Sequence, residues 1–372
     1  MTRPILFFKA GGFSHVNENV VGVLKREFPG AQLRVIDVVS DILKRHPAAA
    51  LRALVDVARI YPREIILKRR EPTDFILRTP AAFRAIKDWV GKNVRVGDAD
   101  FTFQTQSLFD ASTPGIPHFL YTDHTCLANR RNSIPVSAEF FDPRWIAMEK
   151  TAYESARLTF TTSNFARDSL VEDYVMPPER VVCAFSGTNA NPARPAALAR
   201  SIGGKIILFI GIDWVRKGGP DLLKAFDLVA ANHPEALLHI VGCSPAVRHP
   251  RVRTFGQLPL DKVADQLAGA DVFCLPSYFE PSPVAVVEAM HHGLPTVGTR
   301  VGGMSDRIID GETGWLVEAG DIPGLARSLS ALLDDPAQRS SMGEAGRLLA
   351  GKEFTWEATG RRLAAGIRMA CS

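Results

Sequence analysis

Two glutamates, Glu280 and Glu288, flank an almost wholly apolar segment in the run EPSPVAVVEAMHHGLP. Proline fits the first turn of a helix and serine can cap one, so we predict a helix that begins at Ser282 and Pro283 and ends at Gly293. Glu280 then lies on the preceding loop, while Glu288 lies more than one turn inside the helix. Because an unpaired carboxylate is costly to bury among apolar residues, Glu288 needs a partner.

Two cations, Arg216 and Lys217, stand between an expected strand and an expected helix. Free backbone N–H groups at a helix start, together with fixed positive charge, suit a phosphate. The helix start at Ser282, Val284 and Ala285 offers a second set of such amides at the same edge of the sheet. The sequence therefore predicts a diphosphate that bridges the two helix starts.

A nucleotide would also supply the partner of Glu288, because a ribose diol can donate two hydroxyl protons to a carboxylate. The alternative is that Glu288 pairs with an internal arginine or lysine, since paired buried acids are common. Glu280 is placed to meet the group beyond the phosphates, or else it is an ordinary loop acid. Gly256, at another expected strand end, belongs to the same rim.

Small and polar residues also follow two expected strands in the first half of the chain. Gly11 and Gly12 permit a ligand to approach the backbone, although a plain turn accounts for them equally well. His124, which ends a strand, is a candidate to bond a substrate hydroxyl or to stabilise charge, or it is a structural histidine. The acceptor side is assigned to residues near these strand ends: Phe13, Asp123 and Gln104.

Strands alternate with helices through both halves of the chain, which predicts an α/β fold with two parallel sheets. The expected strands are 4–8, 32–38, 101–106, 117–123 and 158–163, then 205–212, 236–242, 252–258, 271–277 and 295–299; helices are expected from about His15, over 219–233 and 261–270, and from about Pro323. The Ala-, Pro- and Gly-rich segment 189–204 separates the halves as a hinge.

These elements give two doubly wound, Rossmann-like domains. We predict a first domain of residues 1–195, a second of residues 196–354, and a tail from about 355 to 372 that returns to the first domain. Ligands bind beyond the carboxyl ends of the strands in such sheets. The two domains are therefore expected to face each other across a cleft.

The composition of the chain and the lengths of its apolar runs exclude several classes of protein. The 372 residues, 46% of them hydrophobic, suffice for two packed domains. No run reaches the ~20 apolar residues of a membrane-spanning helix, and Gly11 and Gly12 come too early for an export signal, so a cytoplasmic protein is expected. A net charge of +4 is too small to indicate nucleic acid as a partner. The five cysteines are scattered, so we expect them to be reduced and mostly buried, without a zinc cluster.

Most of the net positive charge lies between Lys44 and Arg95, where basic residues far outnumber acidic ones. Apolar residues such as Leu51 and Leu54 alternate with them, which makes this stretch, 44–95, a basic amphipathic surface that can rest on anionic lipid at the inner face of a membrane. A solvated helix face is the alternative. The stretch can equally hold a polyanionic or a small soluble acceptor.

The run from Glu280 to Val317 resembles the E-x7-E signature of the large family 4 of retaining glycosyltransferases, or group 1 glycosyl transferases, in the spacing of its two glutamates and in the glycines that follow. Looser similarities are Gly11, Gly12 and His124 in the first half, Trp145 with Glu149, TTSNFARD around Ser163, Gly187, and the late FTWEATGRRL. The resemblance implies the GT-B fold, two Rossmann-like domains across a cleft with a C-terminal helix that returns to the first.

The resemblance also implies roles for individual residues. Arg216 and Lys217 would hold the donor diphosphate, and Glu288 would bind the ribose. Glu280 would lie by the donor sugar, and His124 near the transferred sugar. No metal ion or other cofactor is implied, because protein cations neutralise the leaving diphosphate of a UDP-, GDP- or ADP-sugar.

Three positions depart from the family pattern. An arginine that many relatives carry soon after Gly211 is absent, which leaves Arg216 as its substitute. Pro283 replaces a residue that has an N–H, so one amide donor is missing. Asp306 stands where the family has a glutamate.

The sequence thus favours a retaining hexosyltransferase that moves a sugar from a nucleotide-diphosphate sugar to a hydroxyl of a lipid, a glycan or a small molecule. One alternative is a nucleotide-sugar epimerase on the same scaffold, which would need no acceptor. The other is a non-catalytic nucleotide-sugar-binding protein, against which the intact Arg216, Lys217, Glu280 and Glu288 weigh. The sequence does not indicate an oligomeric state.

Overall fold

The computed structural model of the chain describes residues 3–13, 15–67, 70–131, 138–188 and 205–372. These residues form two compact units. The first comprises the described residues up to Phe185 together with Thr359–Ser372, and the second comprises those of Ser186–Ala358. The predicted hinge 189–204 and the predicted boundary between residues 195 and 196 lie outside the described residues, so the domain boundary stays a prediction.

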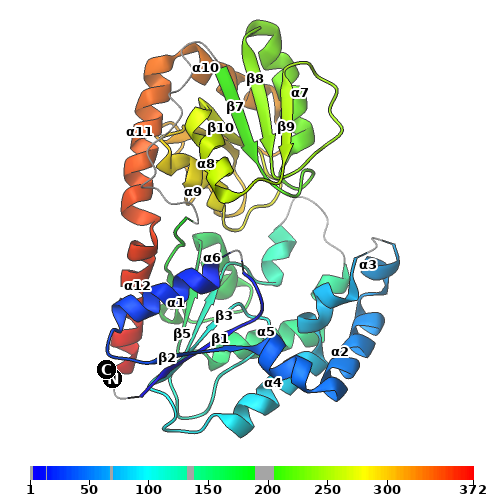
Figure 1. Cartoon of the computed structure of the whole chain (residues 1–372), viewed down its shortest axis with the longest axis vertical. Helices are drawn as coiled ribbons and strands as arrows, with labels where there is room; N and C mark the ends of the chain where they lie inside the picture. The colour runs from blue at the N-terminus through cyan, green and yellow to red at the C-terminus, as the bar shows by residue number, and fades with distance from the viewer. Residues whose placement is uncertain (1–2, 14, 68–69, 132–137, 189–204) are drawn as a thin grey trace. The chain divides into compact units, whose positions relative to one another are not determined.

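The first unit is built on a six-stranded sheet in the order β2-β1-β3-β4-β5-β6, in which every neighbouring pair is parallel (Figure 1). The strands are β1 Ile5–Lys9, β2 Leu33–Asp37, β3 Phe101–Thr105, β4 His118–Thr122, β5 Leu158–Thr161 and β6 Val181–Cys183. Every residue of β3 and β4 is buried. Such complete burial is expected for inner strands of a parallel sheet that is covered on both faces.

Helices connect these strands. They are α1 Val16–Glu27, α2 Pro47–Ile60, α3 Pro62–Ile66, α4 Pro80–Asn93, α5 Pro143–Ser155 and α6 Asn164–Glu172, with the short turns η1 Val38–Ile42, η2 Leu43–Arg45, η3 Pro72–Arg78, η4 Leu127–Arg131, η5 Ala138–Phe141 and η6 Pro178–Arg180. Proline opens four of the six helices, where its missing N–H removes no intrahelical bond.

The second unit repeats the architecture, with the sheet order β12-β11-β10-β7-β8-β9 and parallel pairing throughout. Its strands are β7 Lys205–Ile210, β8 Ala236–Val241, β9 Val252–Gly256, β10 Val272–Leu275, β11 Thr296–Thr299 and β12 Gly314–Val317. Its helices are α7 Gly219–Asn232, α8 Leu260–Gly269, α9 Val284–His291, α10 Ile322–Asp334 and α11 Pro336–Glu353, with the short turn η7 Gly302–Met304.

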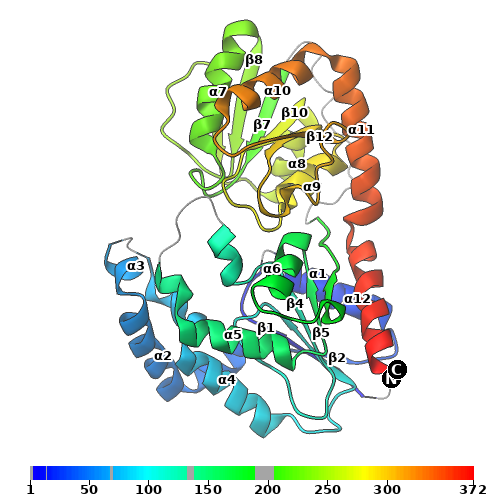
Figure 2. The same ribbon diagram turned by 180° about the vertical axis from the view of Figure 1, so that it is seen from behind.

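The last helix, α12 Trp356–Cys371, lies beside α1 in both ribbon views (Figures 1 and 2). Arg368 donates from Nη2 to the carbonyl of Glu27 at 2.8 Å. Gly360 brings the helix so close to α1 that an added Cβ would lie 2.9 Å from Val23. The C-terminal helix therefore returns to the first unit.

The predicted fold class, an α/β chain with two parallel sheets, is confirmed, and all ten expected strands are present. Two edge strands, β6 and β12, were not predicted because each is short and half-buried in places. The helix after Glu280 begins at Val284, and its predicted cap is wrong, since Pro283 occupies the cap position and no side chain caps it. Only Cys126 and Cys274 of the five cysteines are buried, so the expectation that most are buried is wrong.

Candidate functional site

Three predicted side chains of the second unit meet at the carboxyl ends of β7 and β10, which are neighbours in the sheet. Lys217 lies on the loop after β7, and its Nζ is 2.7 Å from Oε2 of Glu280, on the loop after β10. The Nη1 of Arg216 is 3.6 Å from the same oxygen. Glu280 and Lys217 are largely buried, while about a third of the Arg216 side chain is exposed. The structure thus brings two cations and one carboxylate together.

Further contacts position each cation. Arg216 donates from Nη1 to the carbonyl of Phe279 at 2.5 Å, and its Nε lies 3.4 Å from Oδ2 of Asp213. The Lys217 side chain crosses Gly211, where an added Cβ would lie only 2.3 Å from Lys217 Cδ. Gly211 therefore leaves room for the Lys217 side chain at the end of β7.

The backbone of Glu280 is fixed by the turn that follows β11. The N–H of Gly303 donates to the carbonyl of Glu280 at 2.8 Å. Gly302 adopts a left-handed φ of 54°, and a Cβ there would lie 2.3 Å from that carbonyl oxygen. The double glycine noted in the sequence therefore lets this turn pack directly against the loop that carries Glu280.

Tyr278 joins the two loops a second time. Its N–H donates to the carbonyl of Arg216 at 2.9 Å, and its hydroxyl donates to the carboxylate of Asp221 in the first turn of α7. The hydrogen bond from the hydroxyl raises the pKa of Tyr278. The loops after β7 and β10 therefore form one hydrogen-bonded platform.

The start of α9 is less open than predicted. The N–H of Val284 donates to the carbonyl of Ser282 at 3.0 Å, so the expectation of a free amide at Val284 is wrong. Glu288 lies inside α9 and is 8% exposed, as the sequence predicted. Gly256 ends β9, and its carbonyl accepts from the N–H of Gly242 at 2.7 Å.

The first unit contains a cavity of about 180 Å³ at the carboxyl ends of β3 and β4. Two predicted residues line it, Asp123 and His124, and the hydroxyl of Thr122 fixes their turn by donating to the carbonyl of His124 at 2.7 Å. The remaining lining residues are Arg78, Gln106, Ser107, Leu108, Thr122, Thr125, Cys126, Trp145 and Glu149. Ser107 and Thr125 were missed, although each follows a strand end and that position is itself a signal.

Glu149 anchors the wall of this cavity. Its carboxylate is fully buried and accepts from Ser107 Oγ at 2.8 Å, from Tyr153 at 3.0 Å, from the hydroxyl of Tyr174, and from the N–H of Cys126 at 3.1 Å. Burial raises the pKa of Glu149 even though these hydrogen bonds oppose the shift. The Cys126 bond ties the loop of Asp123 and His124 to α5.

The predicted glycines of the first loop lie at the end of β1. Gly11 has a φ of 56°, and its carbonyl accepts from Nδ2 of Asn17 at 3.0 Å. An added Cβ on Gly12 would have no heavy atom within 4 Å, so the backbone there is open to a ligand. Phe13, assigned to the acceptor side, is 9% exposed and contributes to the core instead.

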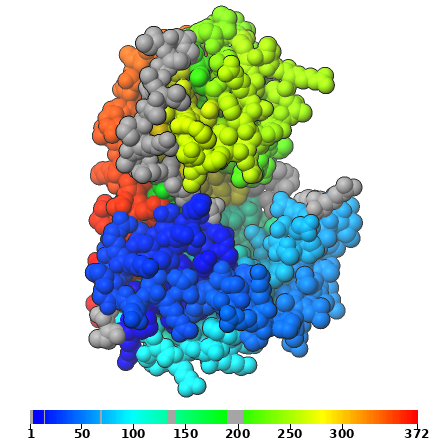
Figure 3. All heavy atoms as spheres, in the orientation of Figure 1, coloured from blue at the N-terminus to red at the C-terminus, as the bar shows by residue number. Residues whose placement is uncertain are grey.

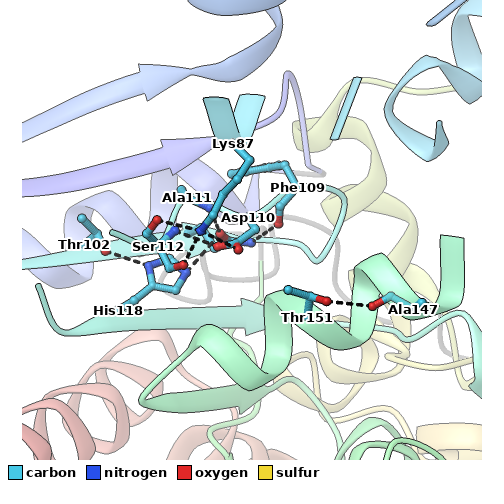
Figure 4. A network of polar contacts seen from close by, with 10 residues as sticks. Lys87, Thr102, Phe109, Asp110, Ala111, Ser112, His118, Ala147 and Thr151 are labelled. Carbon is cyan, nitrogen blue, oxygen red and sulfur yellow. Dashed lines mark hydrogen bonds and ion pairs between the residues drawn. The ribbon is translucent and has the colours of Figure 1, made fainter. Parts of the chain in front are cut away.

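Gln104, also assigned to the acceptor side, is completely buried and does not line the cavity. Its amide donates to the carbonyls of Gln106 and Phe109, both at 2.8 Å, and its oxygen accepts from the N–H of Ala111 at 2.9 Å. Figure 4 shows the neighbouring part of this network around His118 and Asp110. Gln104 thus shapes the loop after β3 from within.

A metal site is not evident among the described residues, in which no three His, Cys, Asp or Glu side chains converge as ligands. No described helix is both long enough and apolar enough to cross a membrane.

The second unit contains the segment that identifies the family. Residues 204–335 match the family described as Glycosyl transferases group 1. This segment is a group 1 glycosyltransferase domain. The resemblance that the E-x7-E run carries is confirmed, and the segment includes Arg216, Lys217, Glu280 and Glu288.

Curated relatives agree with this assignment. The chain is 30% identical over 279 residues to the D-inositol 3-phosphate glycosyltransferase of Thermobispora bispora, which covers 67% of this chain and 64% of that protein. It is 34% identical over 164 residues to a GDP-mannose-dependent monoacylated alpha-(1-6)-phosphatidylinositol monomannoside mannosyltransferase of Corynebacterium glutamicum, with 40% and 43% covered. The chain thus spans less than two thirds of the length of either relative.

Solved structures show the same fold over nearly the whole chain. Sucrose-phosphate synthase from Thermosynechococcus elongatus matches with a TM-score of 0.70 at 20% identity, over 99% of this chain and 98% of that one. HepE from Anabaena, solved with UDP and glucose, matches with a TM-score of 0.67 at 15% identity, over 98% and 99%. Together with the two parallel sheets, these likenesses confirm the GT-B fold.

Proposed function

We propose that the chain is a retaining glycosyltransferase of family 4 that moves a sugar from a nucleotide-diphosphate sugar to a hydroxyl acceptor, without a bound metal ion. The observation that carries the proposal is the cluster of Arg216, Lys217 and Glu280 at the strand ends of a group 1 glycosyltransferase domain. The UDP bound to HepE and the GDP-mannose in the name of the corynebacterial relative support a nucleotide-sugar donor. UDP-, GDP- and ADP-sugars all remain candidates.

The cations of the cluster suit the leaving group. Breaking the bond between the sugar and the phosphate builds positive charge on the sugar ring and negative charge on the departing diphosphate. Groups already fixed where charge develops supply the largest catalytic contribution. Lys217 is held by Glu280 and by its passage over Gly211, so its ammonium would need little reorganisation to bind the diphosphate.

The other residues of the second unit take the roles that the resemblance implied. Glu288 binds the ribose diol, Glu280 lies by the donor sugar, and the N-terminal turn of α9 at Ser282 and Ala285 supports the phosphates. Retention of configuration follows if the acceptor hydroxyl attacks from the side on which the diphosphate leaves. In that step the leaving phosphate accepts the proton of the acceptor hydroxyl, a C–O bond to the acceptor forms, and the C–O bond to the phosphate breaks.

The first unit takes the acceptor in this proposal. Asp123 and His124 line the cavity of about 180 Å³, and Gly12 leaves its backbone accessible. We place His124 near the transferred sugar. The acceptor is a hydroxyl of a lipid, a glycan or a small molecule, and peripheral contact with an anionic membrane through the stretch 44–95 is part of the proposal.

Donor binding and transfer test this function directly. Calorimetry with UDP, GDP and ADP identifies the nucleotide, after which Lys217→Ala and Glu288→Ala should each lower kcat/KM by roughly a hundredfold or more. Lys224→Ala, an exposed lysine on α7, is the matched control and should retain activity. Near wild-type transfer by both site variants would contradict the proposal.

Two further measurements separate the alternatives. The anomeric configuration of the product, read by NMR, must match that of the donor, and added chelator must leave the rate unchanged. Quantitative epimerisation of a nucleotide sugar incubated without any acceptor would instead assign an epimerase.

A further inference from the structure

Most polar side chains that line the cavity of the first unit already have partners within the protein. The buried carboxylate of Glu149 accepts hydrogen bonds from four residues, one of them Ser107. The hydroxyl of Thr122 donates to a backbone carbonyl at 2.7 Å, and that of Thr125 lies 2.7 Å from Oγ of Ser169. The lining thus uses much of its hydrogen-bonding capacity for its own structure, and two residues differ from this pattern.

Gln106 is the first of these two residues. Its backbone has a left-handed φ of 68°, a conformation that residues other than glycine rarely adopt. Its N–H donates to the carbonyl of Tyr121 and its carbonyl accepts from Nε2 of Gln104, both at 2.8 Å, so the surrounding chain enforces the strain. Its side-chain Oε1 is buried and has no hydrogen-bond partner within the part of the chain that the structure describes. Enforced strain and an unsatisfied buried acceptor both point to a functional residue.

Arg78 is the second, and it is the one arginine or lysine among the described residues that line the cavity. Its guanidinium carbon lies 5.2 Å from the centre of the Phe140 ring, and its backbone carbonyl accepts from the hydroxyl of Tyr61 at 2.9 Å. These contacts position the half-buried side chain, yet no described carboxylate pairs with it. Because an arginine keeps its charge at any ordinary pH, this one favours an anion in the cavity beside it.

The cavity is accessible to a ligand. Arg78 ends η3, and Figure 3 shows the chain from α2 to α4, which includes η3, as a continuous blue to light-blue surface. Lys68 and Arg69, in the same stretch, lie outside the described residues. Asp123 and His124 are partly exposed like Arg78, so the lining reaches the surface at more than one residue.

The size and the acceptors of the cavity suit a small molecule with several hydroxyl groups. The volume of about 180 Å³ lies below the roughly 300–1,000 Å³ of pockets for drug-sized ligands, so one ring is the expected occupant. Asp123 has an interaction of its own, but a carboxylate offers roughly four acceptor sites and can bind further hydroxyls. The lining therefore combines hydroxyl acceptors at Gln106 and Asp123 with one charged donor at Arg78.

We propose that Arg78 and Gln106 select an acceptor that is a small polyhydroxylated ring bearing an anionic group. Oε1 of Gln106 accepts a hydrogen bond from a ring hydroxyl, and the guanidinium of Arg78 binds the anionic group, a phosphate or a carboxylate, both of which match its planar fork. The inference rests on the proposed function, which assigns the acceptor to this cavity, and it narrows the class of acceptor. Both residues determine specificity and take no part in the transfer step itself.

Binding of three probes that share one ring tests the proposal without a donor. Glucose 6-phosphate, glucuronate and glucose are titrated into the full chain, and the indole N–H signal of Trp145, which lines the cavity, is followed by NMR after its assignment with Trp145→Phe. At least one of the two charged probes should shift this signal and bind about tenfold or more tightly than glucose, because a charge-assisted hydrogen bond forms. The tighter of the two charged probes identifies the anionic group as phosphate or carboxylate.

Two variants separate the roles of the two residues. Arg78→Gln should abolish the preference for the charged probe and change the affinity for glucose less than about twofold. Gln106→Gly should weaken binding of the charged probe and of glucose about fivefold, because both lose the same hydroxyl acceptor. Its Tm should stay unchanged or rise, since glycine adopts a φ of 68° without strain.

Each variant has a matched control in the first unit. Arg130 also lies over a phenylalanine ring, 5.4 Å from the centre of Phe141, but it is exposed and does not line the cavity. Val175 has a φ of 57° and is 75% exposed, away from the lining. Arg130→Gln and Val175→Gly should both bind the probes as wild type does. Calorimetry with the donor nucleotide, which none of these substitutions should alter, separates failure of this inference from failure of the proposed function.

Four outcomes would overturn the proposal. The first is that no probe shifts the Trp145 signal, and the second is that glucose binds as tightly as both charged probes. The third is an unchanged preference for the charged probe in Arg78→Gln. The fourth concerns Gln106→Gly: unchanged affinity, or a lower Tm together with weaker binding, would assign Gln106 a structural role alone.

Discussion

The Nζ of Lys217 lies 2.7 Å from Oε2 of Glu280, and both side chains are largely withdrawn from solvent. The two residues are 63 positions apart, yet they meet because they follow the adjacent parallel strands β7 and β10. Separate roles were predicted for them, one at the diphosphate and one at the sugar. Their ion pair makes the position of the ammonium depend on the carboxylate.

This pair predicts a measurable coupling in stability. Lys217→Met should lower the free energy of unfolding by about 2–3 kcal/mol, because Glu280 loses its nearest cation and keeps the more distant Arg216 and the hydroxyl of Ser277. Glu280→Gln should have a comparable effect, and the double variant should lose less than the sum, with a coupling of about 1–3 kcal/mol in urea denaturation. Lys224→Met removes a lysine that is 64% exposed and lies 3.6 Å from the carboxylate of Asp221, and it should change stability by less than about 1 kcal/mol. Strict additivity would show that the pair contributes nothing.

The turn at Gly302 gives a second prediction. Gly302→Ala places a methyl group 2.3 Å from the carbonyl oxygen of Glu280 and forces alanine into a left-handed φ. We expect a loss of about 1–3 kcal/mol and a weaker affinity for the donor nucleotide, measured by denaturation and calorimetry. Gly269→Ala, in α8 of the same unit, meets no atom within 4 Å and should leave both values unchanged or raise stability slightly. Equal behaviour of the two variants would contradict the role given to Gly302.

The fold was predictable because its signals are local. Strands such as Ile5–Lys9 and Val272–Leu275 are largely apolar runs near turn residues, and the periodicity of the helices between the strands is plain. The start of α9 was predicted less well, because Pro283 fits both the cap position and the first helical position. Short edge strands such as β6 carry too few residues for a pattern.

The sites were predictable only in part, because burial and contact are properties of the assembled sheet. Strand-end position correctly grouped Lys217 with Glu280, and Asp123 with His124. The same rule failed for Gln104, whose side chain turns inward to satisfy the backbone of its own loop. Nothing in the sequence could show that residues as distant as Ser107 and Tyr174 bond to one carboxylate.

That carboxylate, Glu149, gives a third prediction. Glu149→Gln replaces one acceptor oxygen by a donor amide among hydroxyl and N–H donors, and each donor left unsatisfied costs about 1–3 kcal/mol. We expect a loss of about 2–4 kcal/mol and a displaced NMR signal of the His124 ring, because the loop loses its bond through Cys126. Glu154→Gln, a half-exposed acid on the same helix, should cost less than about 0.5 kcal/mol and leave that signal in place. An unmoved His124 signal in Glu149→Gln would refute the anchoring role.

The buried network of Figure 4 gives the last prediction. His118 is fully buried, with Nδ1 2.7 Å from Thr102 Oγ1 and Nε2 3.1 Å from Gln104 Oε1. Burial lowers the pKa of His118 from 6.5 to about 4; the carboxylate of Asp110 opposes this shift, and the ammonium of Lys87 adds to it. Between these two pH values the unfolded chain therefore binds a proton that the folded chain does not.

Stability must consequently fall as the pH falls from about 6.5 to about 4, because the unfolded state binds more protons over that window. The loss from His118 alone approaches about 3 kcal/mol at the acid end. His118→Gln removes this contribution. The difference in the free energy of unfolding between wild type and His118→Gln, measured by urea denaturation, should therefore decrease by about 3 kcal/mol as the pH falls from about 6.5 to about 4. Thr102→Val, which keeps the imidazole but removes its hydroxyl partner, should be destabilised at every pH and keep the wild-type slope. A parallel pH dependence of wild type and His118→Gln would show that this histidine titrates normally in the folded protein.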